Sequence, residues 1–275
     1  MNYLKFPMVA VIGNRKSGKT IFIEALVKEL VKRRYKVGTV KHIHHRDFAL
    51  DTPGKDTWRH TKAGAKSVVC ISPNEISIIR RINSADNKLD NFLGFLLDEE
   101  IDVLIIEGFR RLLEKNEKIP KIITAKTENE AKEILRESKN VIGVSLQTTT
   151  KEKVLDIPCF GTDKVEKLVD FLEELWKPQK IFKSLPKLDC GLCGFNSCFE
   201  HAKAISEGKS TIKNCPVLFG GAVSITFNGK TIPLNKFLQD LVRNTVLGLV
   251  STLKGVRIKG GETLTISVYQ PNLEE

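Results

Sequence analysis

Long hydrophobic runs are missing from this 275-residue sequence, and no apolar stretch approaches the ~18 residues that a membrane-spanning helix needs. The stretch from Met1 to Gly13 has no long apolar segment followed by a small-residue cleavage site, so no export signal is indicated. Aromatic residues are scarce, at 7%, and do not interleave with a basic stripe, which argues against a nucleic-acid surface. We therefore expect a cytoplasmic protein that binds neither membranes nor nucleic acid.

Acidic residues are in deficit. Asp and Glu number 33 against 44 Lys and Arg, giving a formal net charge of +11. Such a surplus favours polyanionic partners, among them nucleotides, phosphorylated cofactors and acidic protein surfaces. Hydrophobic residues at 41% and charged residues at 28% are typical of a globular chain, and the length suits about two domains.

Strand and helix patterns alternate over residues 8 to 176. Strands separated by helices predict an α/β fold with a mostly parallel, doubly wound sheet, and we assign residues 1–176 to this first domain. The predicted strands are Met8 to Ile12, Val37 to Val40, Ser67 to Ile71, Ile76 to Ile79, Val103 to Ile106, Lys121 to Thr124, Val141 to Val144 and Pro158 to Phe160. The predicted helices are Lys19 to Arg33, Leu89 to Asp98 and Val165 to Leu175.

A stretch with two prolines and four lysines, residues 177–189, predicts a linker. Residues 190–275 then form a smaller α+β domain. Asn228-Gly229 and Gly260-Gly261 are hairpin signals. Between them an amphipathic helix is predicted from Asn235 to Leu253, whose apolar side most simply faces a core, with partner docking as the alternative.

The first predicted strand ends in a complete G-x-x-x-x-G-K-[ST] motif, which is typical of a P-loop that binds nucleoside triphosphates. Glycines let backbone N–H groups curl around phosphate oxygens, and the following helix presents its positive end to the same anion. Lys19 is expected to reach the β- and γ-phosphates and Thr20 to bind Mg²⁺. The motif consists of Gly13, Asn14, Arg15, Lys16, Ser17, Gly18, Lys19 and Thr20.

A carboxylate follows the apolar run Val103 to Ile106. Glu107 stands at the carboxyl end of that strand, where ligands bind in open α/β sheets. A P-loop site needs an acid to hold the Mg²⁺ shell or position water, so Glu107 is the candidate.

Four of the five histidines fall between positions 42 and 60, on the same expected sheet edge. This stretch offers cations for phosphate, a carboxylate for Mg²⁺ or water, and imidazoles that titrate near neutrality. The candidates near phosphate or a pterin are His42, Lys55, Asp56 and Arg59, and Asp56 is also a catalytic candidate, together with Lys19 and Glu107. A transition-metal site formed by His42 and His44, and a plain surface loop, are the alternatives.

The P-loop at residue 13, Lys41 to His45, the P-G-K-D-T-x-R-H stretch, Ala63-Gly64-Ala65 and Ile105 to Phe109 together resemble the MobB family, over residues 8 to 176. This resemblance implies a dimeric GTP-binding P-loop protein with weak GTPase activity. It also implies an accessory role beside the molybdopterin guanylyltransferase, with the molybdo- or tungstoenzyme that receives the cofactor as a second expected partner.

Six cysteines are present, and four of them cluster as Cys190-x2-Cys193-x4-Cys198-x16-Cys215, followed by a proline. In a reducing compartment such a cluster reads as a metal site. Its spacing favours a [4Fe–4S] cluster over zinc, whose ribbons usually pair two C-x2-C units, and over disulfides. Cys70 and Cys159 fall in strand patterns and are expected to be small core residues.

The cysteine segment also resembles the four-cysteine domains of the acetyl-CoA decarbonylase/synthase gamma subunit and of Rnf-type electron-transport subunits. MobB proteins generally lack it. The resulting hypothesis is a GTP-binding accessory protein of molybdenum or tungsten cofactor assembly, with an iron–sulfur module for redox sensing or partner docking. A P-loop small-molecule kinase and a nucleotide-switched redox carrier are the alternatives.

Overall fold

The computed structural model describes residues 6–43, 48–82, 101–147, 152–219, 223, 225–227, 230–232, 234, 236–258 and 264–266. Its contacts divide the chain into two compact units, Met1–Lys180 and Ile181–Glu275, and each is described by itself. His44, His45, the predicted helix at 89–98 and the two predicted turns at 228–229 and 260–261 lie outside the described residues.

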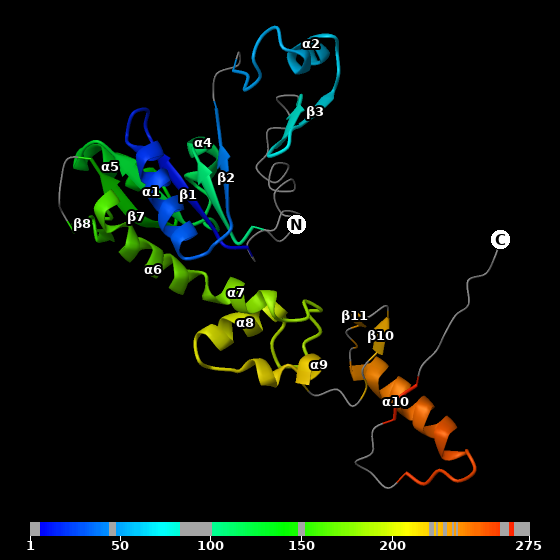
Figure 1. Ribbon diagram of the computed structural model, residues 1–275. Coiled ribbons are helices and arrows are strands. Elements are labelled where there is room, and N and C mark those ends of the chain that lie inside the picture. Colours follow the sequence, from blue (N-terminus) through cyan, green and yellow to red (C-terminus); the bar gives the residue numbers. More distant parts are fainter. Residues whose placement is uncertain are drawn as a thin grey trace. The chain divides into compact units, whose positions relative to one another are not determined.

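The first unit is built on a five-stranded parallel sheet in the order β2-β5-β1-β6-β7 (Figure 1). Its strands are β1 (Met8–Gly13), β2 (Val37–Lys41), β5 (Val103–Glu107), β6 (Lys121–Ala125) and β7 (Val141–Leu146). The P-loop strand β1 is central, and β5 is its direct neighbour. This confirms the predicted parallel α/β fold.

Helices cover both faces of this sheet because β1 alternates its side chains between two cores. Val9 and Val11 pack in one core with residues of α1 (Lys19–Lys32) and α6 (Val165–Leu175). Ala10 and Ile12 belong to the other, with residues of α4 (Arg110–Leu113) and α5 (Glu128–Glu137). A strand that is buried on both faces consists of an unbroken run of apolar residues. These strands could therefore be located accurately from the sequence.

Helices α1 and α6 lie side by side on their face of the sheet (Figure 1). The guanidinium of Arg33 joins them, since it donates to Glu29 Oε1 at 2.8 Å on α1 and to Asp170 Oδ1 at 2.6 Å on α6. Glu173 Oε2 accepts a further bond at 2.9 Å. Several carboxylates sharing one Arg hold it more firmly than a single surface pair would.

Between β2 and β5 in the sequence, the chain forms an additional segment, here called the arm. It consists of α2 (Asp56–Lys62), β3 (Ser67–Ile71) and β4 (Ile76–Arg80). The two predicted strands form, but they pair antiparallel with each other rather than extending the main sheet. Cys70 on β3 is exposed, so its predicted place in a core is wrong. A two-stranded hairpin has too few neighbours to bury both of its faces.

The predicted strand from Pro158 to Phe160 is shifted. A two-residue β9 (Ile157–Pro158) pairs antiparallel with β8 (Lys153–Val154), and the Val144–Cys159 bridge continues beside β7. Leu155 and Asp156 both have positive φ, the backbone of a tight two-residue hairpin turn. A 3₁₀ turn, η3 (Thr162–Lys164), then leads into α6.

Residues 177–189 are not the plain linker that the prolines and lysines suggested, since α7 occupies Lys177–Lys183. Pro178 is the second residue of this helix, and proline is tolerated in the first turn because an N–H there has no intrahelical partner. The division between the two units falls inside α7. Phe182 and Leu185, both from the expected linker, belong to the core around the cysteines.

The second unit contains α8 (Cys198–Ser206), a 3₁₀ turn η4 (Ile212–Asn214), α9 (Pro216–Phe219), β10 (Ile225–Phe227), β11 (Lys230–Ile232) and α10 (Lys236–Ser251). Strands β10 and β11 pair antiparallel as the predicted hairpin requires, with Phe227 opposite Lys230. Leu238 and Leu241 of α10 are 39% and 50% exposed, so the expected core face of this helix is not buried in the described structure.

No helix in the described ranges is long and apolar enough to span a membrane.

Candidate nucleotide and metal sites

The turn after β1 is shaped by two glycines that no other residue could replace without a clash or strain. A Cβ on Gly13 would lie 2.2 Å from the carbonyl oxygen of Thr124, and Gly18 has a left-handed φ of +87°. Lys16 also has a positive φ, of 62°. The chain thus folds back sharply between β1 and α1, which places backbone N–H groups and the amino end of α1 at the carboxyl edge of the sheet.

Lys19, the first residue of α1, reaches back over this turn. Its Nζ donates to Asn14 O at 2.6 Å and to Gly13 O at 3.2 Å. Burial lowers the pKa of Lys19, and the nearby Glu107 carboxylate opposes that shift. The ammonium is therefore held at the mouth of the turn, where an anion would meet it.

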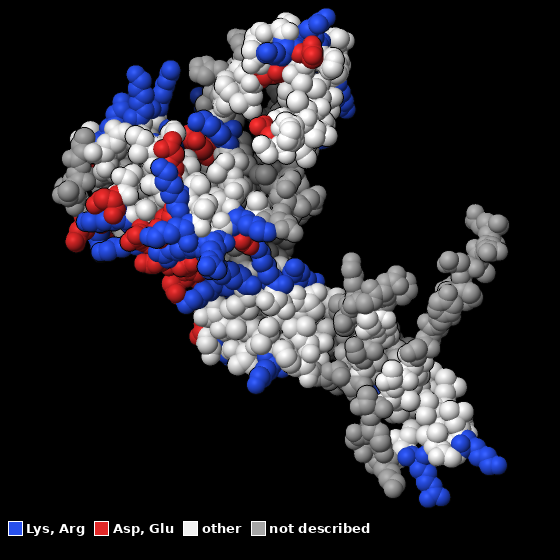
Figure 2. All heavy atoms as spheres, in the orientation of Figure 1, with Lys and Arg blue, Asp and Glu red and all other residues white. Residues whose placement is uncertain are grey.

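Ser17 anchors the turn to the neighbouring strand. Its side chain is buried, and its Oγ shares a 2.7 Å hydrogen bond with Thr124 Oγ1 on β6. The Thr20 side chain stays exposed at the start of α1, as do Arg15 and Lys16 in the turn. Lys and Arg side chains gather over the loop between β1 and α1 in Figure 2. Ser17 thus has a structural bond, while Thr20 remains available to a metal ion.

Glu107 ends β5 in register with Val11 of β1 and Lys41 of β2. Its carboxylate is largely buried and lies 3.2 Å from the Lys41 ammonium. Strand pairing therefore brings Lys41 to Glu107, and Lys19, at the start of α1, lies near enough to the same carboxylate to interact with it. The sequence suggested Glu107 and Lys19 but not the role of Lys41 as the ion partner of Glu107.

His42 lies beside the same edge, because its backbone N–H donates to Glu107 O at 3.0 Å. Its ring stacks on Phe109, with centroids 4.4 Å apart and an interplanar angle of 24°. The imidazole therefore has a packing role next to the acid. His44, its proposed partner in a metal site, lies outside the described residues.

The remaining candidates of the first domain belong to the arm. Lys55 immediately precedes α2, and Asp56 and Arg59 lie on that helix, with largely exposed side chains 3.9 Å apart. Helix α2 contacts β3 of the same arm. The sequence grouped these residues with the P-loop through their order along the chain, and the structure places them on a separate element.

Two residues at the P-loop carried no motif of their own in the sequence. The guanidinium of Arg110 on α4 donates to Asn14 Oδ1 at 2.6 Å, and Gln147 Nε2 after β7 donates to Lys16 O at 3.4 Å. Arg110 directly follows the E-G-F segment, so its position could have been suspected. Gln147 reaches the turn only because β7 pairs with β6, which no local pattern reveals.

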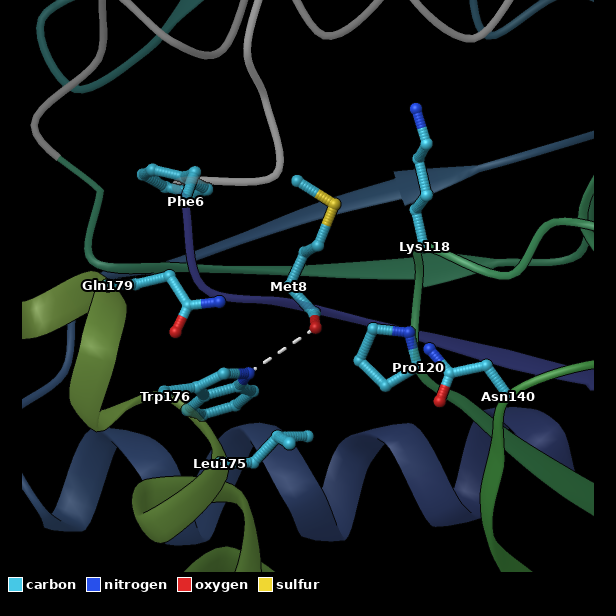
Figure 3. A pocket seen from close by; sticks show the side chains of 8 residues that line it. All are labelled: Phe6, Met8, Lys118, Pro120, Asn140, Leu175, Trp176 and Gln179. Atoms are coloured by element: carbon cyan, nitrogen blue, oxygen red, sulfur yellow. Dashed lines mark hydrogen bonds between the residues drawn. The ribbon is translucent and has the colours of Figure 1, made fainter. Parts of the chain in front are cut away.

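A separate hollow of about 110 Å³ lies at the opposite, amino-terminal edge of the sheet (Figure 3). Trp176 closes one side, and its Nε1 donates to Met8 O at 3.4 Å. The other walls come from Phe6, Lys118, Pro120, Asn140, Leu175 and Gln179. This hollow is at the far end of β1 from Gly13, so it does not belong to the P-loop site.

The four clustered cysteines are all free thiols in the second unit. Cys198 and Cys215 are buried in one small core with Phe182, Leu185 and Ala202. Cys190 and Cys193 are half-buried, in a loop where Gly191 and Gly194 supply positive φ angles of 73° and 86°. Glycine is suited to such a sharp turn because it has no Cβ to clash.

Electrostatic contacts link three of these thiols. Burial raises the pKa of Cys215, and Cys193 and Cys198 add to that rise, whereas backbone N–H groups of Leu218 and Val217 oppose it. N–H groups directed at sulfur are among the features that tune iron–sulfur sites. The Cys198 N–H is held by Asp189 Oδ1 at 2.7 Å, and this bond fixes the start of α8.

Four thiols are a donor set that both iron–sulfur clusters and structural zinc sites use. Within the described residues, no three His, Cys, Asp or Glu side chains converge as a single-ion site requires. A four-iron cluster binds each thiolate at a different iron, whereas zinc draws four ligands to one centre at about 2.0–2.3 Å. Cys198 and Cys215 are buried in the small core, and Cys190 and Cys193 are half-buried in the loop before α8, so the four thiols together offer the sulfur donors that such a group needs.

Two family models match parts of this chain. The family model described as "Molybdopterin guanine dinucleotide synthesis protein B" (MobB) matches residues 8–147. The chain belongs to the MobB family. A second family model, described as "Putative Fe-S cluster", matches residues 185–217, which include all four clustered cysteines.

Some relatives match nearly the whole chain, and others match about two thirds of it. A "Putative molybdopterin-guanine dinucleotide biosynthesis adapter protein" of Methanocaldococcus jannaschii is 30% identical over 90% of this chain and 92% of its own length. The "Molybdopterin-guanine dinucleotide biosynthesis adapter protein" of Escherichia coli is 29% identical over 63% of this chain and 95% of its own length. The crystal structure of Bacillus subtilis MobB is 26% identical, covers 60% of this chain and 97% of its own length, and has a TM-score of 0.49.

Proposed function

We propose that this MobB-family protein binds GTP with Mg²⁺ at the carboxyl edge of its sheet and acts as an adapter in molybdopterin guanine dinucleotide biosynthesis. The observation that supports this most is the P-loop turn of the central strand, with Lys19 over it and Glu107 at the end of the adjacent strand. The names of its relatives in Methanocaldococcus jannaschii and Escherichia coli supply the pathway.

Each part of the turn has a definite role in this proposal. Backbone N–H groups of residues 13–20 hold the phosphates, and Lys19 exchanges its bonds to Asn14 O and Gly13 O for phosphate oxygens. Thr20 and Glu107 would complete the Mg²⁺ shell, and Lys41, now 3.2 Å from the Glu107 carboxylate, would move to the triphosphate. We propose that the bound GTP is hydrolysed only weakly, as the family resemblance implies.

The adapter role concerns two partner proteins, the molybdopterin guanylyltransferase and the enzyme that receives the finished cofactor. His42 and the arm residues Lys55, Asp56 and Arg59 are proposed to contact phosphate or pterin. The cysteine module would hold a [4Fe–4S] cluster through Cys190, Cys193, Cys198 and Cys215. When bound, this cluster supplies a one-electron redox centre.

The protein is proposed to act in the cytoplasm as a homodimer. The β3–β4 hairpin exposes a group of β-branched side chains, Val69, Ile71, Ile76 and Ile78, which are each more than half exposed. Contiguous apolar surface of this kind is typical of protein interfaces, and a second copy of the chain is the partner we infer. Light scattering of the purified protein measures whether the dimer exists.

Calorimetry with GTP and with ATP tests nucleotide binding. Lys19→Ala is expected to weaken triphosphate binding by about 100-fold, because charge-assisted hydrogen bonds to phosphate are lost. Glu107→Ala is expected to leave affinity closer to that of the unaltered protein while reducing hydrolysis and its Mg²⁺ dependence. Lys28→Ala, an exposed position further along α1, is the matched control. Unchanged affinity in Lys19→Ala would refute the proposed site.

The same experiments separate the alternatives. Rapid phosphoryl transfer to a small acceptor would identify a kinase instead of an adapter. Anaerobic purification with metal analysis and an absorption spectrum, before and after addition of GTP, tests the cluster. A redox-silent zinc site would exclude the nucleotide-switched redox carrier.

A further inference from the structure

A reversal of the backbone at Gly108 and Phe109 holds Arg110 close to the P-loop. Arg110 follows Gly108 and Phe109, whose φ angles are +87° and +54°, so the chain reverses sharply at the end of β5. The left-handed region is strained for a bulky residue such as phenylalanine. Phe109 is held there by burial, at 4% exposed, and by its stacking on His42. Strain kept at the edge of a candidate site suggests that the position of the next residue matters.

The two cations Arg110 and Lys19 meet at one residue of the P-loop turn. Arg110 Nη1 donates to the side-chain Oδ1 of Asn14 at 2.6 Å, and Lys19 Nζ donates to its backbone oxygen at 2.6 Å. Asn14 directly follows Gly13, and α4, which carries Arg110, contacts β1. The guanidinium therefore lies beside the turn that would enclose the phosphates.

Surface carboxylates orient the guanidinium without enclosing it. Nη2 donates to Glu137 Oε2 at 2.9 Å on α5, and Nε lies 3.6 Å from Glu114 Oε2. The Arg110 side chain is 30% exposed. Arginine has five N–H donors in a planar fork, so it can keep these carboxylates while exchanging the neutral amide of Asn14 for a charged phosphate oxygen.

We propose that Arg110 is a catalytic residue of GTP hydrolysis in this protein, contacting the γ-phosphate and stabilising its charge within the same chain. In the reaction, the oxygen of water forms a bond to the γ-phosphorus while the bond from that phosphorus to the β–γ bridging oxygen breaks. GDP leaves with the electron pair, and the proton of the water passes to phosphate and solvent. An arginine placed on the transferring group increases such rates by about 10³-fold or more. The assignment rests on the proposed function.

Lys41, another basic residue at this edge, is less suited to the task. Its ammonium is paired with the Glu107 carboxylate at 3.2 Å, which is proposed for the metal, and it offers a point charge rather than a fork. The alternative role for Arg110 is a structural one, tying α4 to α5 through Glu137. That structural role would affect stability but not the ratio of affinities for ground and transition states.

The test compares Arg110→Ala and Arg110→Lys with Arg111→Ala, an exposed arginine on the same short helix. We expect phosphate release in Arg110→Ala to be slower by about 10²–10³-fold, with the Kd for GTP changed by less than about threefold. Arg110→Lys should not restore the rate, whereas added guanidinium ion should partly restore it in Arg110→Ala. GDP with aluminium fluoride, which mimics the transferring phosphoryl group, should bind to the unaltered protein and to Arg111→Ala but not to Arg110→Ala.

Three results would overturn the assignment: an unchanged rate in Arg110→Ala, full rescue by lysine, or equal losses in Arg110→Ala and Arg111→Ala. Any of them leaves the proposed GTP site intact if the unaltered protein binds GTP and Lys19→Ala does not. Failure of the unaltered protein to bind GTP would overturn the proposed function itself, and the role of Arg110 with it.

Discussion

In the first unit, strands such as β1 and β5 are buried on both faces, and two hydrophobic cores hold them between helices. Among the described residues of the second unit, the core around the cysteines has five buried residues, and two of them are Cys198 and Cys215. A core so small supplies little hydrophobic stabilisation by itself. From this difference we expect that the first unit is stabilised by its packing, whereas the stability of the second depends on a group bound by its thiolates.

The largest expected effect is from removing one buried thiol. Cys198→Ala should abolish iron binding and the visible iron–sulfur absorption, because each thiolate holds one iron. Folding and metal binding are coupled in such small modules, so amides in residues 198–219 should lose hydrogen-exchange protection while β1 and β6 keep theirs. Cys70→Ala, at an exposed cysteine of the arm, is the control. Persisting protection at 198–219 in Cys198→Ala would show that the second unit folds without its cluster.

A smaller effect is expected at Gly13, where a side chain would meet backbone and side-chain atoms of β6 at close range. Gly13→Ala should destabilise the protein by about 1–3 kcal/mol, since its Cβ would lie 2.2 Å from Thr124 O and force β1 and β6 apart. The free energy of unfolding in urea measures this loss, and calorimetry with GTP should show a parallel loss of affinity. Gly248→Ala on α10 meets open space and should be neutral or slightly stabilising. Equal stability of both variants would argue against close packing at the P-loop.

The smallest expected effect concerns a buried lysine in the first unit. The side chain of Lys121 is inaccessible to solvent, its Nζ donates to the carbonyl oxygens of Asn116, Ile119 and Lys139, and burial lowers its pKa to about 8 from 10.5. Between these two pH values the unfolded chain binds a proton that the folded chain has released. The free energy of unfolding should therefore rise with pH over that window, by on the order of 1 kcal/mol.

Urea unfolding at pH 7.5, 9 and 10.5 (about the limits of that window) measures the rise. It should be absent in Lys121→Met and retained in Lys118→Met, a neighbouring exposed lysine. A rise of the same size in both variants would assign the pH dependence to other groups. Because Lys121 lies on β6, hydrogen exchange should localise the effect to the sheet of the first unit.

Local patterns predicted the buried elements best. The helix Val165–Leu175 was located residue for residue, and β1, β5 and β6 to within one residue, because their apolar residues repeat with the period of the structure. The same reasoning failed at α7, where Pro178 was taken as a sign of a linker although it starts a helix. It also failed at Cys70, since an apolar strand pattern does not reveal whether a second layer covers the strand.

The residues of the candidate site also differ in whether local sequence patterns could predict them. Gly13, Gly18, Lys19 and Thr20 could be named from sequence because one turn contains them all, and the cysteine spacing similarly indicated a metal site. The ion pair of Lys41 with Glu107 and the contact of Arg110 with Asn14 join residues 66 and 96 positions apart. Such contacts follow from strand order, which local periodicity does not encode.

By itself, the sequence determined which residues are candidates for binding phosphate and a thiolate-ligated metal, because short turns and cysteine spacings are local features. The tertiary structure alone decided which charges face those residues. Placing β5 between β1 and β2 brings Glu107, Lys41 and Lys19 to one edge, and the left-handed turn at Gly108 and Phe109 brings Arg110 to the P-loop. The physical reason is that long-range pairing of strands is set by the sum of many buried contacts, and no single segment carries that sum.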